Sequence, residues 1–388
     1  MTAVDRTRDW WLVHRPHVAA LGAYWAPGRI NLIGDHIDYL GGTVLPMTLD
    51  RGTAVLVLPR ADRELHVHAL DVDDHAGFSH RPTMSGARSR QGNWRDFVSG
   101  LLGLDDMRPD ESGEGLDVIV SGDLAGGGLS SSASFTLALA LAMMSHGWLR
   151  PRAGVDLARF ARAVEVEHVG TACGLMDQLA IVHGSDTGAV AIDCSSGDVS
   201  EVPTSWQNRE LLVMHCGQPR RLADAGYNQR RAELRRGLAA LGLPEHRIPE
   251  LSVDAVEATL GESVEARRLR HVISEQQRVM TARTALTEQD WPVLGAAMTA
   301  SHASLRDDYE VSVPALDALV AAAVKTPGCD GARLTGAGFG GWAIALIEGR
   351  ARDAVLAAAA KAMDREPGTL DSFVACPGGA ARALELCP

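Results

Sequence analysis

A glycine-rich stretch followed by serines limits the fold of this chain more than any other part of its sequence. The residues before it, 116–120, predict a β-strand, and the alanine- and leucine-rich residues after it, 135–144, predict a helix. A glycine turn therefore joins a strand to the N-terminus of a helix. The stretch reads Gly126-Gly127-Gly128-Leu129-Ser130-Ser131-Ser132-Ala133-Ser134.

Such a turn is suited to holding phosphate. A helix N-terminus has unpaired N–H groups and a partial positive charge, glycines let a ligand approach the backbone, and hydroxyls add donors. An ordinary turn with a serine N-cap is the alternative, and this stretch alone leaves both open. A Walker A loop is excluded, because the only lysines are Lys325 and Lys361 and neither follows such glycines.

The composition is that of a folded globular protein. The chain has 388 residues, enough for two domains, with 46% hydrophobic and 22% charged residues. Its formal net charge of -12 argues against nucleic acid or an anionic membrane as the main partner.

The cysteines and the N-terminus favour a cytoplasmic protein. No two of the 6 cysteines form a Cys-x-x-Cys pair, so we expect free thiols in a reducing compartment. Residues 1–9 are polar and do not resemble a signal peptide, and the longest apolar run, 137–144, is too short to span a bilayer. We take the chain to be a monomer.

The hydrophobic pattern alternates strands with helices, and residues 203–205 are a plausible crossover between domains 1–205 and 206–388. Strands are predicted over 53–58, 65–70, 116–120, 189–193, 210–214 and 342–347. Helices are predicted over 1–25, 94–104, 135–144, 152–169, 173–183, 227–241, 269–286, 293–305 and 313–324.

A dense polar set follows a short apolar segment near the N-terminus. Arg29, Asp35, His36 and Asp38 lie within eleven positions. Carboxylates and histidine can hydrogen-bond sugar hydroxyls, and the arginine could hold a carboxylate or phosphate in its fork. An exposed loop can also hold such a set by chance.

Acidic residues between 165 and 177 are candidates for phosphoryl-transfer chemistry. Asp177 lies in an apolar stretch, so a buried carboxylate there needs a partner, and an arginine would suit a kinase. A simple helix cap is the alternative. Glu165 or Glu167 could reach a magnesium ion carried on ATP phosphates, although a solvated helix face explains them as well.

For three weaker features, a structural role is a better explanation than a functional one. Residues 335–341 form a second glycine loop, interpreted as a tight turn between a helix and a strand. His66 and His68 could be two metal ligands, but no third ligand is evident, so we favour a structural role. Considered without the other motifs, Trp94 is interpreted as a core residue.

Taken together and in order, six segments resemble the galactokinases, a family of the GHMP small-molecule kinases. Any one segment could mislead, but six with the right spacing are highly specific, and the likeness covers most of the chain. The segments are Gly28 to Tyr39, Gly126 to Ser134, Cys173 to Gln178, Ala225 to Arg231, Ser301 to Ser312 and Leu334 to Gly341.

The resemblance implies a two-domain GHMP kinase fold. It has an N-terminal α/β domain with a mixed sheet and helices, a C-terminal ferredoxin-like α+β domain, and an active site between them. It also implies transfer of the γ-phosphoryl group of MgATP to the anomeric hydroxyl of galactose.

The same resemblance implies roles for single residues. Arg29 and Asp177 would be the catalytic pair, with Asp177 receiving or orienting the proton of the sugar. Gly126 to Ser132 would cradle the phosphates, with Trp94 near the adenine, and Ser132 and Glu165 would hold Mg²⁺. The expected sugar contacts are Asp35, His36, Asp38, Gly174 and Tyr227.

Two departures from the family pattern concern the sugar. Asp35 stands where glutamate is usual, one methylene shorter at the 6-hydroxyl, and Leu40 replaces a common asparagine. A pocket that hydrogen-bonds a hydroxyl discriminates strongly, so the substrate could differ. The alternatives are a related anomeric kinase for N-acetylgalactosamine or arabinose, and a non-catalytic sugar and ATP sensor.

Overall fold

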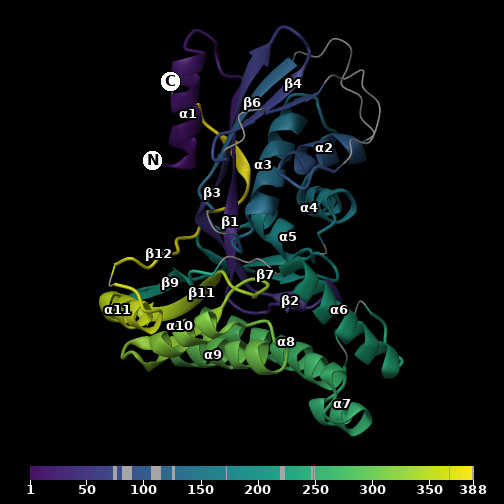
Figure 1. Ribbon diagram of the computed structural model, residues 1–388, viewed down its shortest axis with the longest axis vertical. Helices are drawn as coiled ribbons and strands as arrows, with labels where there is room; N and C mark the ends of the chain where they lie inside the picture. Colours follow the sequence, from purple (N-terminus) through teal and green to yellow (C-terminus); the bar gives the residue numbers. More distant parts are fainter. Residues whose placement is uncertain are drawn as a thin grey trace.

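The computed structural model describes residues 1–72, 77–80, 90–105, 115–124, 127–171, 173–218, 223–245, 248, 250–366 and 368–386 (Figure 1). Residues 1–205, here called the first half, contribute most of a six-stranded mixed sheet with the order β13-β1-β3-β6-β4-β5. Neighbours are antiparallel except for β4 and β6. The strands are β1 (Gly22–Asn31), β3 (Pro46–Arg60), β4 (Leu65–Ala69), β5 (Phe78–His80), β6 (Gly115–Gly122) and β13 (Arg382–Leu384).

Helices cover both faces of this sheet. Figure 1 shows α1 (Ala3–His14) on one face and α3 (Ser131–Ser145) on the other, beside α2 (Arg95–Leu104), α4 (Gly154–Ala163) and α5 (Met176–His183). Val55 and Val57 pack in the core on the α3 side, whereas Leu56 and Leu58 pack with Trp11 on the α1 side. The central strand therefore reads as a continuous apolar run, because both of its faces are buried.

A small three-stranded sheet lies beside this layer. It has the order β2-β7-β8, formed by β2 (Thr43–Val44), β7 (Gly188–Asp193) and β8 (Val199–Pro203). Helix α8 of the second half packs against β2 and β8, so this sheet lies where the two halves meet.

Residues 206–388, the second half, carry an antiparallel sheet with the order β10-β11-β9-β12. Along the chain a strand, a set of helices, two strands, a helix and a strand follow one another, which is the ferredoxin-like arrangement. The predicted fold class is confirmed. The elements are β9 (Arg209–His215), α6 (Ala223–Ala240), α7 (Val253–Leu260), α8 (Val264–Glu288), α9 (Trp291–Asp307), α10 (Pro314–Lys325), β10 (Cys329–Leu334), β11 (Trp342–Glu348), α11 (Arg352–Ala362) and β12 (Ser372–Val374).

Some predicted boundaries were wrong. The helix expected over 1–25 ends at His14, because Pro16 follows its C-cap Arg15, and the next residues enter β1. The helix expected over 152–169 is α-helical only to Ala163 and continues as a π-helix over Val164–Val169. The helix expected over 173–183 begins at Met176.

The second glycine loop lies in a different setting from the predicted one. It joins strand β10 to strand β11, rather than a helix to a strand. The pattern did not reveal β10, because Asp330, Gly331 and Arg333 interrupt its apolar run.

The chain passes from β8 to β9 through residues 204–208, while β13 returns to pair with β1. The division at 205 and 206 stays a prediction. Among the described helices, none combines the length and the apolar character that crossing a membrane requires.

Candidate active site

Arg29 lies at a kink in the first strand of the large sheet. The pairing of β1 with β3 shifts register between Pro27 and Arg29, which is a bulge, and bulges often re-aim a side chain next to a site. At Gly28 a Cβ atom would lie 2.8 Å from the backbone carbonyl oxygen of Leu129, so a side chain there would force the backbone to shift. Arg29 Nη1 then donates to the Gly128 carbonyl at 3.0 Å.

Asp177, in the first turn of α5, is bound on both carboxylate oxygens. Arg29 Nε donates to Oδ1 at 2.9 Å, and Arg29 Nη2 forms an ion pair with the same oxygen at 2.6 Å. Ser130 Oγ donates to Oδ2 at 2.6 Å. The predicted arginine partner of this carboxylate is confirmed, whereas the bond from Ser130 was not predicted.

The glycine stretch leaves the N-terminus of helix α3 open, so an anion could bind there. Gly127, Gly128 and Ser130 have φ values of 70°, 91° and 61°, and Trp342 Nε1 donates to the Gly127 carbonyl at 2.9 Å. Because the Ser130 hydroxyl binds Asp177 instead of capping the helix, the first-turn N–H groups stay available to a ligand. Gly126 lies outside the described residues.

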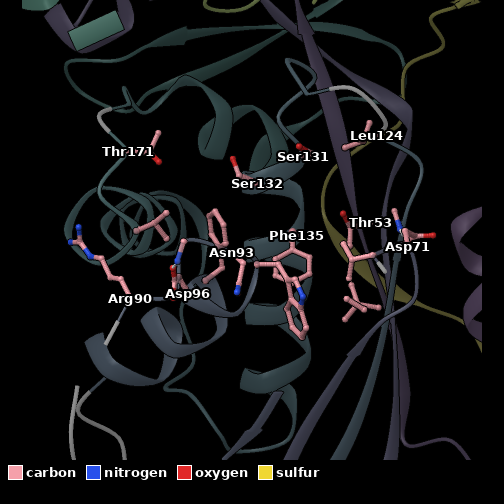
Figure 2. A pocket seen from close by; sticks show the side chains of 18 of the residues that line it. Thr53, Asp71, Arg90, Asn93, Asp96, Leu124, Ser131, Ser132, Phe135 and Thr171 are labelled. Carbon is pink, nitrogen blue, oxygen red and sulfur yellow. Dashed lines mark hydrogen bonds between the residues drawn. The ribbon is translucent and has the colours of Figure 1, made fainter. Parts of the chain in front are cut away.

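A cavity of about 660 Å³ lies beside the start of α3. Trp94, Ser131 and Ser132 are among its lining residues, and the ring of Trp94 lies edge-on to Phe135 at 6.2 Å. Trp94 therefore borders this cavity rather than lying wholly in the core. Figure 2 shows Ser131, Ser132 and Phe135 along α3, with Arg90 and Asp96 on one side and Thr53 and Asp71 on the other.

A second cavity, of about 110 Å³, gathers the remaining predicted residues. It shares Ser132 and Thr171 with the large cavity, so molecules bound in the two would meet there. Thr171 was not predicted. The predicted residues among those that line it are Arg29, Asp35, His36, Asp38, Ser132, Glu165, Gly174, Asp177 and Tyr227.

Glu165 points into this junction and Glu167 does not. Ser132 Oγ donates to Glu165 Oε2 at 2.9 Å, and Gln178 Nε2 donates to Oε1 at 2.7 Å. Burial and the nearby charge of Asp177 raise the pKa of Glu165 to about 7. Glu167 is exposed, so of these two glutamates it is Glu165 that lies against Ser132 in the cavity.

Asp38 and Gly174 lie in direct contact on one wall of the small cavity. A Cβ atom at Gly174 would lie 1.7 Å from Asp38 Oδ2, so a side chain there would displace the carboxylate. Burial, followed by the charges of Asp177 and Asp35, raises the pKa of Asp38 to about 6. This carboxylate can therefore accept or donate a hydrogen bond near neutral pH.

Asp35 is held by a residue that the sequence did not reveal. It is 2% exposed and forms an ion pair with Arg333, which is fully buried in β10. The sequence did offer one signal of this partner: Arg333 is a single charged residue between the small residues 331–332 and the glycine loop. Leu40 packs in the core at 3% exposure, so of the two departures from the family pattern only Asp35 lines the cavity.

The histidines of β4 have a third potential ligand after all. The ligand atoms of Asp117 on β6, His66 and His68 lie within 4.8 Å of one another, so the structure shows a third candidate ligand that was not evident from the sequence. Its oxygens, however, accept from Arg60 at 2.7 Å and from Arg15 at 2.9 Å. Two guanidinium groups disfavour a cation there, and a structural role remains the better explanation.

Three family models match the chain. They are the galactokinase galactose-binding signature over residues 15–59, the GHMP kinases N terminal domain over 101–185 and the GHMP kinases C terminal domain over 282–365. The crystal structure of the Methanococcus jannaschii mevalonate kinase shares the fold at 18% identity, with a TM-score of 0.64 over 94% of this chain and 99% of that one. The fold and the site thus define a small-molecule kinase of the GHMP class.

Closer relatives are galactokinases. That of Exiguobacterium sibiricum is 35% identical over 93% of this chain and 94% of the relative, and that of Roseiflexus sp. is 38% identical over 89% and 86%. The Lactococcus lactis galactokinase, crystallised with galactose, superposes with a TM-score of 0.87 at 29% identity, covering 98% of this chain and 99% of that one. The chain belongs to the galactokinase family and is an ATP-dependent sugar kinase.

Proposed function

We propose that this kinase transfers the γ-phosphoryl group of MgATP to the anomeric hydroxyl of galactose, giving galactose 1-phosphate and ADP. One observation carries the proposal most directly. The Arg29–Asp177 pair lines the small cavity, and this cavity shares Ser132 with the large one. A sugar in the small cavity and a triphosphate entering from the large one would meet beside this pair.

The small cavity would hold the sugar. Asp35 and Asp38 offer carboxylate oxygens to hydroxyl donors, and His36 and Tyr227 add ring surface, with their ring centroids 5.5 Å apart. Gly174 would let the sugar and Asp38 approach the backbone closely. Hydroxyl-rich substrates suit such a polar wall, since each buried group needs a partner.

The large cavity would hold the nucleotide, with Trp94 near the adenine. The phosphates would bind the turn Gly126 to Ser132 and the N-terminus of α3. This arrangement replaces the lysine of a Walker A loop by backbone N–H groups, hydroxyls and the helix dipole.

Asp177 would orient the sugar hydroxyl for in-line attack. Its carboxylate accepts the hydrogen bond of the anomeric O–H and takes the proton as the new O–P bond forms and the bond to the leaving ADP oxygen breaks. Arg29 fixes that carboxylate through two contacts, and its guanidinium steadies negative charge on the transferring group.

Ser132 and Glu165 fit a magnesium ion. A hydroxyl and a carboxylate oxygen only 2.9 Å apart at the cavity junction form a hard oxygen donor pair, which magnesium prefers. Bound there with ATP, the ion would neutralise charge on the phosphate oxygens. We also propose the division into domains 1–205 and 206–388, a cytoplasmic location and a monomer without a nucleic-acid or membrane partner.

ATP-dependent ADP release with a panel of sugars tests the proposal. The panel comprises galactose, 2-deoxygalactose, galactosamine, N-acetylgalactosamine, arabinose and glucose. The highest kcat/KM with galactose is the expected result. A different best sugar would retain the kinase and change its substrate, and galactose binding without ADP release would favour a sensor.

A further inference from the structure

Helix α8 carries a stripe of buried polar side chains that the proposed chemistry does not use. Arg268, His271 and Glu275 are 1%, 0% and 0% exposed. Their spacing of three and four residues places them on one face of the helix. Apolar residues would normally fill such positions, since a buried charge is costly unless it is fully paired.

Glu275 holds the backbone of the predicted sugar segment. Its Oε1 accepts from Gly34 N at 2.9 Å and from Ser301 Oγ at 2.6 Å, while its Oε2 accepts from Arg278 Nε at 2.7 Å. Burial acts to raise the pKa of Glu275, but Arg278, followed by other nearby groups, lowers it to about 2. The Glu275 carboxylate is therefore negatively charged at neutral pH, and it contacts Gly34, the residue that precedes Asp35.

His271 holds the peptide unit between Asp35 and His36. Its Nε2 donates to the Asp35 carbonyl at 3.1 Å, and its Nδ1 lies 3.0 Å from Ser304 Oγ. The backbone it supports is unusual, because Gly34 has a φ of 105° and His36 has a φ of 67°. A non-glycine residue in that region is strained and persists only when its surroundings fix it.

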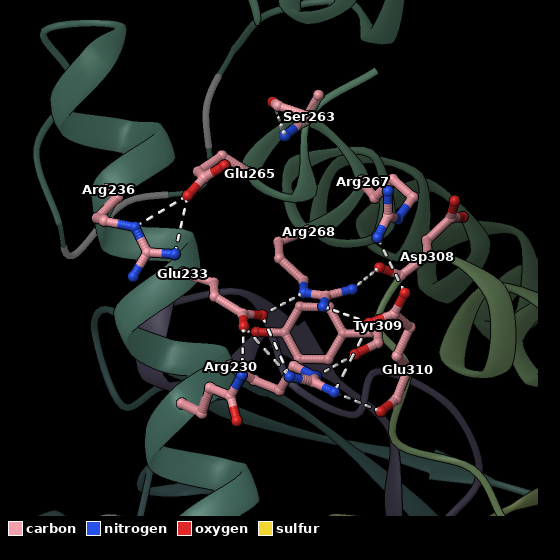
Figure 3. A network of polar contacts seen from close by, with 12 residues as sticks. Arg230, Glu233, Arg236, Ser263, Glu265, Arg267, Arg268, Asp308, Tyr309 and Glu310 are labelled. Atoms are coloured by element: carbon pink, nitrogen blue, oxygen red, sulfur yellow. Dashed lines mark hydrogen bonds and ion pairs between the residues drawn. The ribbon is translucent and has the colours of Figure 1, made fainter. Parts of the chain in front are cut away.

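Arg268 holds helix α6, which also carries Tyr227. Figure 3 shows Arg268 beside Glu233 of that helix. Its Nε donates to Glu233 of α6 at 2.7 Å and its Nη2 donates to Glu310 at 2.6 Å. Arg230, one turn beyond Tyr227, donates to the Tyr309 carbonyl at 2.7 Å. These bonds tie α6 to α8 and to the segment between α9 and α10.

We propose that Arg268, His271 and Glu275 are positioning residues of the sugar cavity. They fix, from one helix of the second half, both the first-half segment with Asp35 and His36 and the helix with Tyr227. The proposal rests on the proposed function, because it takes the small cavity to be the sugar site. The large cavity is lined by residues of the first half, so nucleotide binding should not depend on this stripe.

Glu275→Gln tests the most direct link. One end of an amide is a donor, so either Gly34 N or Arg278 loses its acceptor. We expect the Kd of the sugar, measured by calorimetry without nucleotide, to rise about tenfold or more, while the KM for ATP stays within about twofold. A folded variant with the parent's sugar Kd would overturn the proposal.

His271 supplies a second test should Glu275→Gln not fold. His271→Leu removes the donor to Asp35, whereas His271→Gln places an N–H near the position of Nε2. The leucine variant should weaken sugar binding about fivefold or more and the glutamine variant should recover most of it. Equal sugar affinities in both variants and the parent would contradict the proposal.

Arg152→Met is the matched control. Arg152 is paired with the buried Asp105 at 2.5 Å, and neither residue lines either cavity. This variant should have a lower melting temperature but an unchanged sugar Kd and an unchanged KM for ATP. A higher sugar Kd in this variant would mean that lost stability alone explains the effects of the Glu275 and His271 substitutions.

The parent is assayed first with the sugar panel. If another sugar is best, the galactose assignment fails and the variants are tested with that sugar; a parent that binds no sugar overturns both proposals.

Discussion

The hydroxyl of Ser130 donates a 2.6 Å hydrogen bond to Asp177 Oδ2, so the N-cap residue of helix α3 also fixes the carboxylate at the start of α5. Ser130 has a φ of 61°, a backbone conformation that few non-glycine residues adopt. Strain of this kind is retained where the surrounding structure fixes it, and here it joins the proposed phosphate turn to the proposed base.

Ser130→Ala should therefore lower kcat about tenfold while both KM values change by less than about threefold. A hydrogen bond to a charged group contributes roughly 1.5–3 kcal/mol, and here it orients the group that meets the sugar hydroxyl. Steady-state kinetics with galactose and ATP measure the effect. Ser131→Ala, at the neighbouring hydroxyl in the large cavity, should change the KM for ATP instead.

Asp177→Asn should lower kcat by about 100-fold or more, because an amide cannot take the proton of the hydroxyl. Sugar affinity should change little, since the amide keeps the shape of the side chain. Turnover and a calorimetric sugar titration separate the two quantities. Near-normal turnover would remove Asp177 from the mechanism.

Gly174→Ala should raise the KM for the sugar about tenfold or more and leave the KM for ATP nearly unchanged. The new methyl group would lie 1.7 Å from Asp38 Oδ2 and would push that carboxylate out of place. Gly103→Ala is the control, because that helical glycine has open space around its Cβ position. The control should be neutral or slightly stabilising.

Asp35→Glu should change the selectivity among sugars that differ at C6. The longer side chain must move either toward the sugar or against Arg333, which is fully buried. The ratio of kcat/KM for galactose to that for L-arabinose, which lacks the C6 hydroxymethyl group, should shift. Equal changes for both sugars would count against a C6 contact.

Glu165→Gln should stabilise the metal-free protein at alkaline pH. The pKa of Glu165 is about 7 in the fold, raised by burial and Asp177 above the ordinary value of 4.5 for a glutamate. Its contribution to folding is therefore fully present below pH 4.5 and is lost as the pH rises through 7. Thermal unfolding at pH 6 and pH 8 should show a gain for the variant on the order of 2–3 kcal/mol, larger at pH 8. An equal gain in stability of the variant over the parent at pH 6 and at pH 8 would disprove the raised pKa.

The sequence predicted the site well where chemistry lies in short segments. Arg29 and Asp177, 148 residues apart, each lie in a distinctive local setting, and their pairing follows from the need of a buried carboxylate for a cation. The strand, turn and helix around Gly128 also follow from local composition.

The supporting residues could not be predicted, because their meaning depends on distant partners. Glu275 and Gly34 are 241 positions apart, and Arg333 and Asp35 are 298 apart. In the sequence, a charged residue on a helix or strand usually indicates an exposed position, so residue type alone could not identify the buried stripe of α8 or the buried Arg333 of β10.

The pairing of β13 with β1 has a consequence for synthesis. Ala23 of the first strand lies opposite Leu384, so this edge of the sheet stays open until residues 382–384 have left the ribosome. Leu384 packs against the cluster of Ala3, Trp25 and Ala54, so β13 lies close to the start of α1 (Figure 1). An unpaired edge strand can join another chain, which makes the nascent first half prone to misassociation until its last strand arrives. Joining the two ends and opening the chain elsewhere would deliver that strand first and should shorten this exposure.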